Sequence, residues 1–95
     1  MNDNEKTLKS AIDEILSSHQ LKDKVVLARL KEHWQSLFGK HIDQHTTRIK
    51  IYKQVLTIEV DSAPLRQELL FSKELILSRI NEFFEKTVVN DLKLK

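Results

Sequence analysis

The stretch TRIKIYKQVLTIEV, residues 47–60, decides the fold because its apolar and polar side chains alternate. A period of two is typical of strands that bury one face. A two-residue turn at Lys53–Gln54 would set the register Tyr52–Val55, Ile51–Leu56, Lys50–Thr57, Ile49–Ile58 and Arg48–Glu59. The large aliphatic pairs would then share one face. The sequence therefore predicts an antiparallel hairpin with one side on a core.

Two amphipathic helices are predicted before the hairpin. In the first, at residues 5–17, apolar side chains recur with helical spacing at Leu8, Ile12, Ile15 and Leu16. The second starts at Asp23, which is a suitable N-cap, and its apolar stripe runs to Phe38. Gly39 follows, and glycine readily takes the positive φ found just past a helix end. We expect the second helix to end there.

The chain after the hairpin predicts a helical region and a last strand. Asp61 or Ser62 can cap a helix whose first turn accommodates Pro64. The helical pattern then continues for about 23 residues, which is long for a globular helix, so we expect a bend or break at Ser72–Lys73. The stretch VVNDLKLK, residues 88–95, predicts a third strand. Its inner side would carry Val88, Leu92 and Leu94, and its outer side Val89, Asp91, Lys93 and Lys95.

The predicted fold class is α+β, a KH-like (type II-like) two-layer domain with the order α-α-β-β-α-(α)-β and a three-stranded sheet. This is the element order of a type II KH domain with an extra N-terminal helix. KH domains grip nucleic acid with a GxxG loop between two helices, but the equivalent stretch here, LLFSKEL at residues 69–75, has no glycine. Residues 1–95 are expected to form one domain, with residues 1–6 as a flexible end.

Composition and charge exclude several classes of function. The chain has no cysteine, so it cannot form disulfides or a zinc ribbon. It has no signal sequence and no run of roughly 18 apolar residues, so we expect a soluble cytoplasmic protein that does not associate with membranes. Residues 1–21 carry two basic and four acidic side chains, residues 22–60 eight and four, and residues 61–95 six and six, giving net charges of −2, +4 and 0. Any electropositive surface should therefore lie mid-chain.

The sequence FGKHIDQHT, residues 38–46, holds the only glycine and two of the four histidines, yet it lacks the pattern of an active site. His41 and His45 could meet on one helical face, as in HExxH zinc sites, but Ile42 occupies the position of the required glutamate. One glycine cannot build a phosphate-binding loop, and no G-x-S-x-G elbow is present. We expect no catalysis, no metal and no cofactor, with His45 and Thr46 bracing the entry to the first strand and His41 exposed.

The open face of the hairpin is a candidate nucleic-acid-binding surface. Basic groups interleaved with an aromatic ring suit phosphate contact and base stacking. The candidate residues are Arg48, Lys50, Tyr52, Lys53 at the turn, and Lys93 on the last strand. The alternative is an ordinary solvated sheet face, in which Glu59 pairs with Arg48.

A second surface is a candidate for protein contact. Phe71 lies off the main apolar stripe, and an exposed Phe71 together with Leu75 would indicate a protein-binding patch. Arg66 and Arg79 project from the same helical region, although acidic neighbours favour ordinary surface ion pairs. Trp34 is a further candidate for partner contact, but its place on the apolar stripe favours core packing.

Several modest motifs together resemble one known family. They are W-x3-F-G-K-x-I-x2-H-T at residues 34–46, RIKIYKQVLTIEV at residues 48–60, DSAPLRQEL at residues 61–69 and LILSRINEFF at residues 75–84. Their order and spacing are similar to those of the DciA-type family of small bacterial proteins, and the resemblance covers the chain from Leu8 to Leu94. It implies a KH-like domain that assists the loading or operation of the replicative DNA helicase, with an auxiliary capacity to contact DNA.

Two functional hypotheses follow from these patterns. The first is a non-enzymatic replication accessory protein that binds the replicative DNA helicase, and it rests on the family resemblance. The second is a general RNA- or DNA-binding module of KH-like fold without a GxxG loop, which the basic middle of the chain favours. A salt-dependent affinity for nucleic acid, or its absence, separates them.

Overall fold

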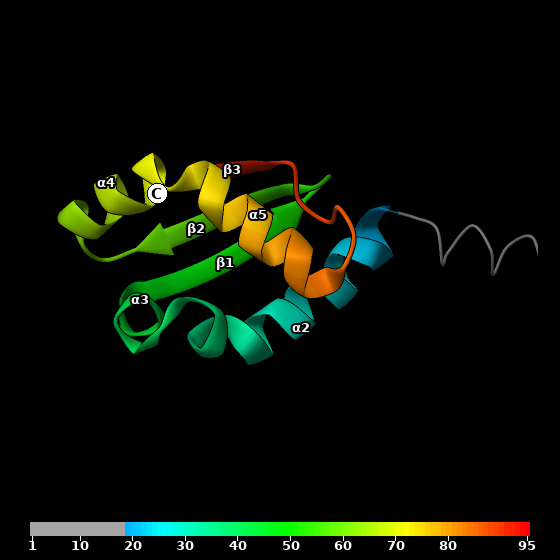
Figure 1. Ribbon diagram of the computed structural model, residues 1–95, viewed down its shortest axis with the longest axis horizontal. Coiled ribbons are helices and arrows are strands. Elements are labelled where there is room, and N and C mark those ends of the chain that lie inside the picture. The colour runs from blue at the N-terminus through cyan, green and yellow to red at the C-terminus, as the bar shows by residue number, and fades with distance from the viewer. Residues whose placement is uncertain (1–18) are drawn as a thin grey trace, which may run out of the picture.

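The structure is a computed structural model that describes residues 19–95, and these residues form four helices and a three-stranded sheet around one core (Figure 1). In chain order the elements are α2 (His19–Phe38), α3 (Lys40–His45), β1 (Thr46–Tyr52), β2 (Val55–Val60), α4 (Ala63–Phe71), α5 (Lys73–Phe84) and β3 (Asp91–Leu94). This architecture confirms the predicted α+β class. The helix predicted at residues 5–17 and the flexible end predicted at residues 1–6 lie outside the described residues.

The hairpin has the predicted register. Arg48 faces Glu59, and each following pair matches the prediction up to Tyr52 and Val55. Lys53 and Gln54 form the two-residue turn, with φ of 49° and 66°. Positive φ at both central positions matches the twist of the strands that the turn joins, so the backbone takes the conformation of a tight turn although neither residue is glycine or asparagine.

β3 completes a mixed sheet of order β1-β2-β3, in which β3 runs parallel to β2. The third strand was predicted from Val88, but it begins at Asp91. Val89, predicted to face outward, is fully buried. The side chain of Asn81 explains this difference because its Oδ1 accepts the amides of Val88 and Val89 at 2.8 and 3.1 Å, and its Nδ2 donates to the Val89 carbonyl at 2.9 Å. A side chain therefore satisfies backbone groups that a sheet partner would otherwise satisfy.

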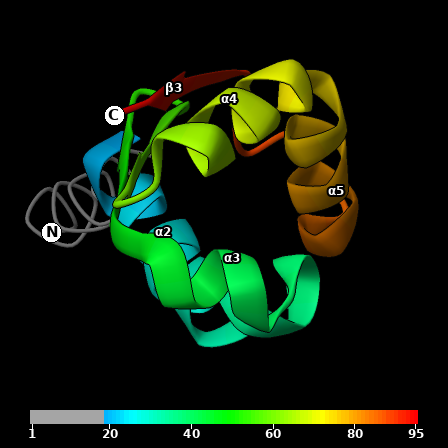
Figure 2. The ribbon, with the colours of Figure 1, turned by 90° about the vertical axis from the view of Figure 1, so that its left-hand side faces the viewer.

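The helices enclose the buried face of the sheet. Figure 2, a view along the long axis, shows the sheet on one side with α4, α5 and the pair α2–α3 completing a ring. The core side chains inside this ring are Leu30, Trp34, Ile49, Leu56, Ile58, Val60, Leu65, Leu69, Ile76, Leu77, Ile80, Val88, Val89 and Leu92. The opposite face of the sheet carries the exposed side chains of Arg48, Lys50 and Lys93.

Helix boundaries follow local chemistry in most places. The Ser62 hydroxyl accepts the Leu65 amide at 3.3 Å, and Pro64 lies in the first turn of α4, as predicted. The expected break is confirmed at Ser72, which separates α4 from α5. The prediction of Asp23 as an N-cap is wrong, because α2 already includes His19 and Asp23 lies inside the helix with 8% of its surface exposed.

The corner at Gly39 joins α2 to the sheet. Gly39 has φ of 93°, as expected for a residue that ends a helix, and its amide donates to the Gln35 carbonyl at 2.7 Å. The following residues form α3, a short helix that the sequence patterns did not predict. The Thr46 hydroxyl donates to the Ile42 carbonyl at 2.6 Å and accepts the Trp34 indole N–H at 3.1 Å. The predicted bracing role of Thr46 is therefore confirmed.

Candidate functional site

An exposed apolar patch lies where α4 meets α5. Leu70, Phe71 and Leu75 are 50%, 89% and 58% exposed, and we call these three residues the Phe71 patch. Each helical residue turns the chain by about 100°, so Phe71 points roughly opposite to Leu69, which is buried. The break at Ser72 then leaves the patch at a corner of the molecule. The condition stated for a protein-binding patch, an exposed Phe71 together with an exposed Leu75, is therefore met.

A groove of 510 Å³ lies beside the Phe71 patch. Its walls come from both halves of the fold, since α4 and α5 form one side and the α2–α3 corner forms the other. The apolar wall residues are Phe38, Ile42, Leu65, Leu69 and Ile76, together with Phe71 and Leu75 of the patch, and the polar ones are His41, Glu68, Ser72 and Arg79. Leu65, Leu69 and Ile76 are also core residues, so folding itself forms the groove. We call it the Phe71 groove.

The two arginines predicted to contact a partner occupy different places. Arg79 lines the Phe71 groove, where its Nη1 donates to the Leu37 carbonyl at 3.2 Å and its guanidinium carbon lies 6.0 Å from the centroid of the Phe38 ring. Arg66 does not line it, and its Nη2 donates to the Val60 carbonyl at 3.0 Å, which directs the guanidinium toward the end of β2. Only Arg79 is therefore placed beside the patch.

Trp34 requires a correction. It is 2% exposed, packs 4.6 Å from the Phe38 ring centroid, and donates its indole N–H to Thr46. A buried side chain with a satisfied donor offers no surface to a partner. Trp34 is a core residue, and its assignment to the partner-binding set is wrong.

Four of the predicted nucleic-acid-binding residues lie on the open face of the sheet, and the fifth, Lys53, lies in the hairpin turn beside it. The strand registers place Lys50 beside Thr57 and Thr57 beside Lys93, so the two lysines lie in one row across three strands. Arg48 occupies the next row on the same face of β1. We call Arg48, Lys50, Tyr52, Lys53 and Lys93 the basic face, and all five side chains are exposed.

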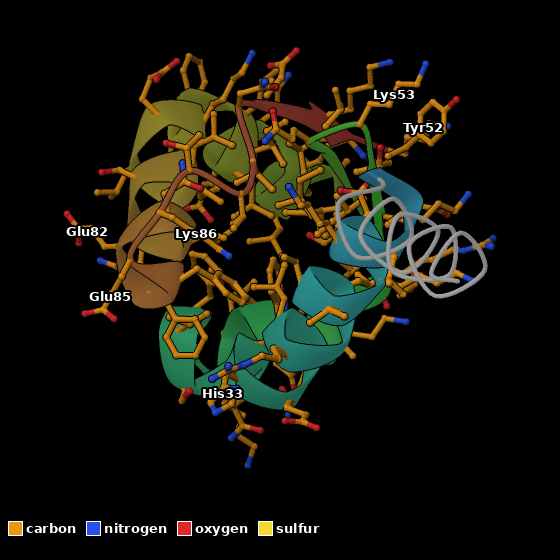
Figure 3. The ribbon with its side chains drawn as sticks, turned by 90° about the vertical axis from the view of Figure 1, so that its right-hand side faces the viewer. His33, Tyr52, Lys53, Glu82, Glu85 and Lys86 are labelled. Carbon is orange, nitrogen blue, oxygen red and sulfur yellow. The ribbon has the colours of Figure 1, made fainter. Side chains whose placement is uncertain are left out.

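The aromatic residue of the basic face stands at its edge. Tyr52 is 71% exposed, and the Nζ of Lys53 lies 5.4 Å from the centroid of its ring. Figure 3 shows both side chains projecting from the tip of the hairpin. A flat, accessible ring beside a cation is the arrangement that stacks on a nucleic-acid base while contacting a phosphate.

Two acidic residues reduce the positive charge of this face. Glu59 was expected to pair with Arg48, but its carboxylate lies 3.8 Å from the Nζ of Lys50 instead. Asp91 pairs with Lys73 at 2.6 Å. The hydrogen bond from Lys73, together with that from the Leu92 amide, lowers the pKa of Asp91, and the same carboxylate raises the pKa of Lys73. Lys73 therefore compensates the charge of Asp91.

The contacts of the histidine pair join α3 to the end of β2. His41 is exposed, and its ring centroid lies 5.0 Å from that of His45, whose Nδ1 is 2.7 Å from the Oδ1 of Asp61. The Asp61 amide also donates to the His45 carbonyl at 3.0 Å, which ties α3 to the end of β2. Within residues 19–95, no group of three or more His, Cys, Asp or Glu side chains is placed to hold a metal ion.

Sequence reasoning missed part of the apolar surface. It did not single out Leu70, although the run LLF at residues 69–71 has more apolar residues than one helical stripe can bury. It also missed Phe38 and Ile42 as groove walls, because they meet α4 and α5 only in the folded chain.

Among the helices of the described part, none is long and apolar enough to cross a membrane.

Comparisons with known proteins identify the family. No curated protein and no solved structure gives a significant match to this chain. A family model described as "Dna[CI] antecedent, DciA" matches residues 7–94, which is nearly the whole sequence. This match confirms the resemblance carried by the motifs at residues 34–84. The chain therefore belongs to the DciA family, whose role is associated with helicase loading in DNA replication.

Proposed function

We propose that this protein is a non-enzymatic accessory factor that binds the replicative DNA helicase and assists its loading or operation. Membership of the DciA family supports the helicase as the partner. We further propose that the contact is made through the Phe71 patch and the Phe71 groove. The observation that carries this assignment is the 89% exposure of Phe71 at the edge of a preformed apolar groove.

The energetics favour this surface for a protein partner. Burying a phenylalanine side chain in an interface contributes about 1.5–3 kcal/mol, and large aromatic residues are frequent among the few side chains that carry most of the binding energy. Leu70 and Leu75 extend the apolar area on either side of Phe71. Arg79 adds a cation at the margin of the groove, and interface margins are typically polar.

The test is a titration of the full chain against the replicative helicase from the same organism. We expect Phe71→Ala to weaken binding by roughly tenfold or more. Tyr52→Ala is the matched control, because Tyr52 is also a highly exposed aromatic residue but lies on the basic face. If the unmodified chain does not bind at tens of micromolar, the helicase assignment fails. If Phe71→Ala binds as tightly as the unmodified chain, another surface makes the contact.

A second proposed activity is nucleic-acid binding by the basic face. The row of Lys50 and Lys93 across the sheet, with Tyr52 at the hairpin tip, supports it. The chain has no GxxG loop, so binding would use side-chain cations and ring stacking instead of backbone gripping. This activity could accompany helicase binding, or stand alone as a general RNA- or DNA-binding function.

The measurement is fluorescence anisotropy with single-stranded DNA, single-stranded RNA and duplex DNA of one sequence over a series of salt concentrations. For single strands, the logarithm of affinity should fall with the logarithm of salt concentration with a slope of about −0.7 per neutralised phosphate. Lys50→Gln should make that slope shallower, whereas Lys40→Gln, an exposed lysine on α3, should not. An absence of affinity for every probe at low salt would rule the activity out.

A further inference from the structure

A second groove, of 340 Å³, lies at the other end of α2 from the Phe71 groove. It is formed by the first turns of α2, the hairpin turn at Gln54 and the chain that leads into β3. The 20 residues of α2 span roughly 30 Å, so the two grooves are well separated. We call this one the Val25 groove, and nothing in the proposed function uses it.

The Val25 groove has an apolar floor and a basic rim. Val26 and Val88 line it, and Val88 is a core residue. Val25 is 54% exposed beside them and extends the apolar surface of the groove. Lys22 and Lys86 are the exposed cations of the lining.

Figure 3 looks onto this end, with Lys86 on the side of α5 and the hairpin tip on the other side. The one acidic residue of the lining, Asp23, is 8% exposed, and its Oδ2 accepts the Lys53 amide. The exposed charged residues of the lining are therefore both cations, while Glu85 is exposed next to Lys86 in the chain.

The chain itself carries a segment with complementary properties directly before α2. Residues 5–17 have the aliphatic stripe of an amphipathic helix, formed by Leu8, Ile12, Ile15 and Leu16. Residues 5–17 also carry three acidic and two basic side chains, so their net charge is −1. An acidic segment with an apolar stripe fits a groove with an apolar floor and a basic rim.

We propose that residues 5–17 pack as an amphipathic helix in the Val25 groove of the same chain. Connections between packed helices can be as short as two residues, and Ser17, the last residue of the segment, would form such a connection with Ser18. A reversed helix would bring Ile12 beside Val25. The segment comes just before the first residue of α2, so the Val25 groove is the nearer of the two, because the Phe71 groove lies at the other end of that helix.

The chain contains no cysteine, so an engineered pair reports the contact cleanly. We expect the full-length variant Ile12→Cys/Val25→Cys to form an intramolecular disulfide under mild oxidation, seen as a faster-migrating monomer without reductant. Ile12→Cys/Leu75→Cys is the control, because Leu75 has a similar exposure of 58% but lies in the Phe71 patch. A disulfide-linked dimer of the Val25 pair would show instead that a second copy occupies the groove, and absence of any cross-link would overturn the proposal.

Amide hydrogen exchange of the otherwise unmodified chain provides a second measurement. Docking should slow exchange in residues 8–16, and Val25→Asp should then accelerate exchange there by roughly tenfold or more, while Leu75→Asp leaves it unchanged. If exchange in residues 8–16 is equally fast in all three proteins, the segment does not occupy the groove. Neither measurement involves the helicase, so a negative result leaves the proposed helicase contact unaffected.

Discussion

The carboxylate of Asp23 on α2 accepts a hydrogen bond from the backbone amide of Lys53, 30 residues later, with an Oδ2–N distance of 2.9 Å. This contact joins the beginning of the described helix to the tip of the hairpin. On the other side of the turn, the Asn90 amide donates to the Gln54 carbonyl at 2.8 Å. The turn that presents Tyr52 and Lys53 is therefore fixed from both sides, which positions the end of the basic face.

Removing the Asp23 carboxylate should destabilise the protein. Asp23→Ala leaves the Lys53 amide without its acceptor, and hydrogen bonds to charged groups contribute about 1.5–3 kcal/mol. We expect a loss of that size in the free energy of unfolding, measured by urea denaturation. Asp23→Asn is the control, because an amide oxygen can still accept the bond and the loss should be smaller. Equal stability of Asp23→Ala and the unmodified chain would mean that the contact contributes nothing.

The turn itself can be stabilised. Gln54 has φ of 66°, and the left-handed conformation costs a non-glycine residue roughly 1–2 kcal/mol. Gln54→Gly should therefore raise the free energy of unfolding, although the greater flexibility of unfolded glycine offsets part of the gain. Gln67→Gly, in the exposed interior of α4, is the matched control and should lower it by about 1 kcal/mol. If both variants lose stability, the positive φ of Gln54 does not lower the free energy of unfolding measurably.

The hairpin was predictable because its information is local. Alternation over residues 47–60 fixes which side chains share a face, and one turn position then fixes the whole register. The position of Phe71 off the buried stripe was predictable for a similar reason, since it follows from helical periodicity alone, although Leu70 was not singled out. In both cases the decisive neighbours lie within a few residues in the sequence.

The failures involve contacts between distant residues. Asp23 was predicted to be an N-cap, whereas its carboxylate accepts the backbone amide of Lys53 on the hairpin. The local sequence does not reveal that contact. Val89 was placed outside because alternation continues through residues 88–95, whereas Asn81 ends the strand pattern by binding two amides. The grooves were not foreseen, because their walls come from elements that meet only after folding.

Asn81 should be among the residues on which stability depends most. Its Oδ1 accepts the amides of Val88 and Val89, two buried residues, and each buried donor left unpaired costs about 1–3 kcal/mol. We expect Asn81→Ala to lower the free energy of unfolding by about 2–4 kcal/mol. Asn90→Ala is the control, because the Asn90 side chain makes one exposed hydrogen bond, at 3.2 Å to Gln54. A loss for Asn81→Ala no greater than for Asn90→Ala would contradict this role.

The Lys73–Asp91 pair predicts how stability depends on pH. The hydrogen bond from Lys73 lowers the pKa of Asp91 below its ordinary value of 3.8, so its stabilising effect is present above pH 3.8 and is lost as the pH falls through the lowered pKa. Asp91 raises the pKa of Lys73 above 10.5, so that contribution is present below pH 10.5 and is lost as the pH rises through the raised pKa. Between these limits the contribution should be constant and modest, because both groups are accessible to solvent.

Asp91→Asn removes the charge from this pair and allows the pH dependence to be measured. The difference in unfolding free energy between the unmodified chain and Asp91→Asn should be greatest at neutral pH and should shrink as the pH falls below 3.8. The matched control is Asp43→Asn, since within residues 19–95 the Asp43 carboxylate makes no ion pair, and no such trend is expected. Urea denaturation of the three proteins from neutral to acidic pH provides the measurement. A difference for Asp91→Asn that stays constant down to the lowest pH would show that the ion pair does not shift the titration of Asp91. The same substitution leaves Lys73 uncompensated beside the basic face, so affinity for single-stranded nucleic acid should rise at low salt if that face is the binding surface.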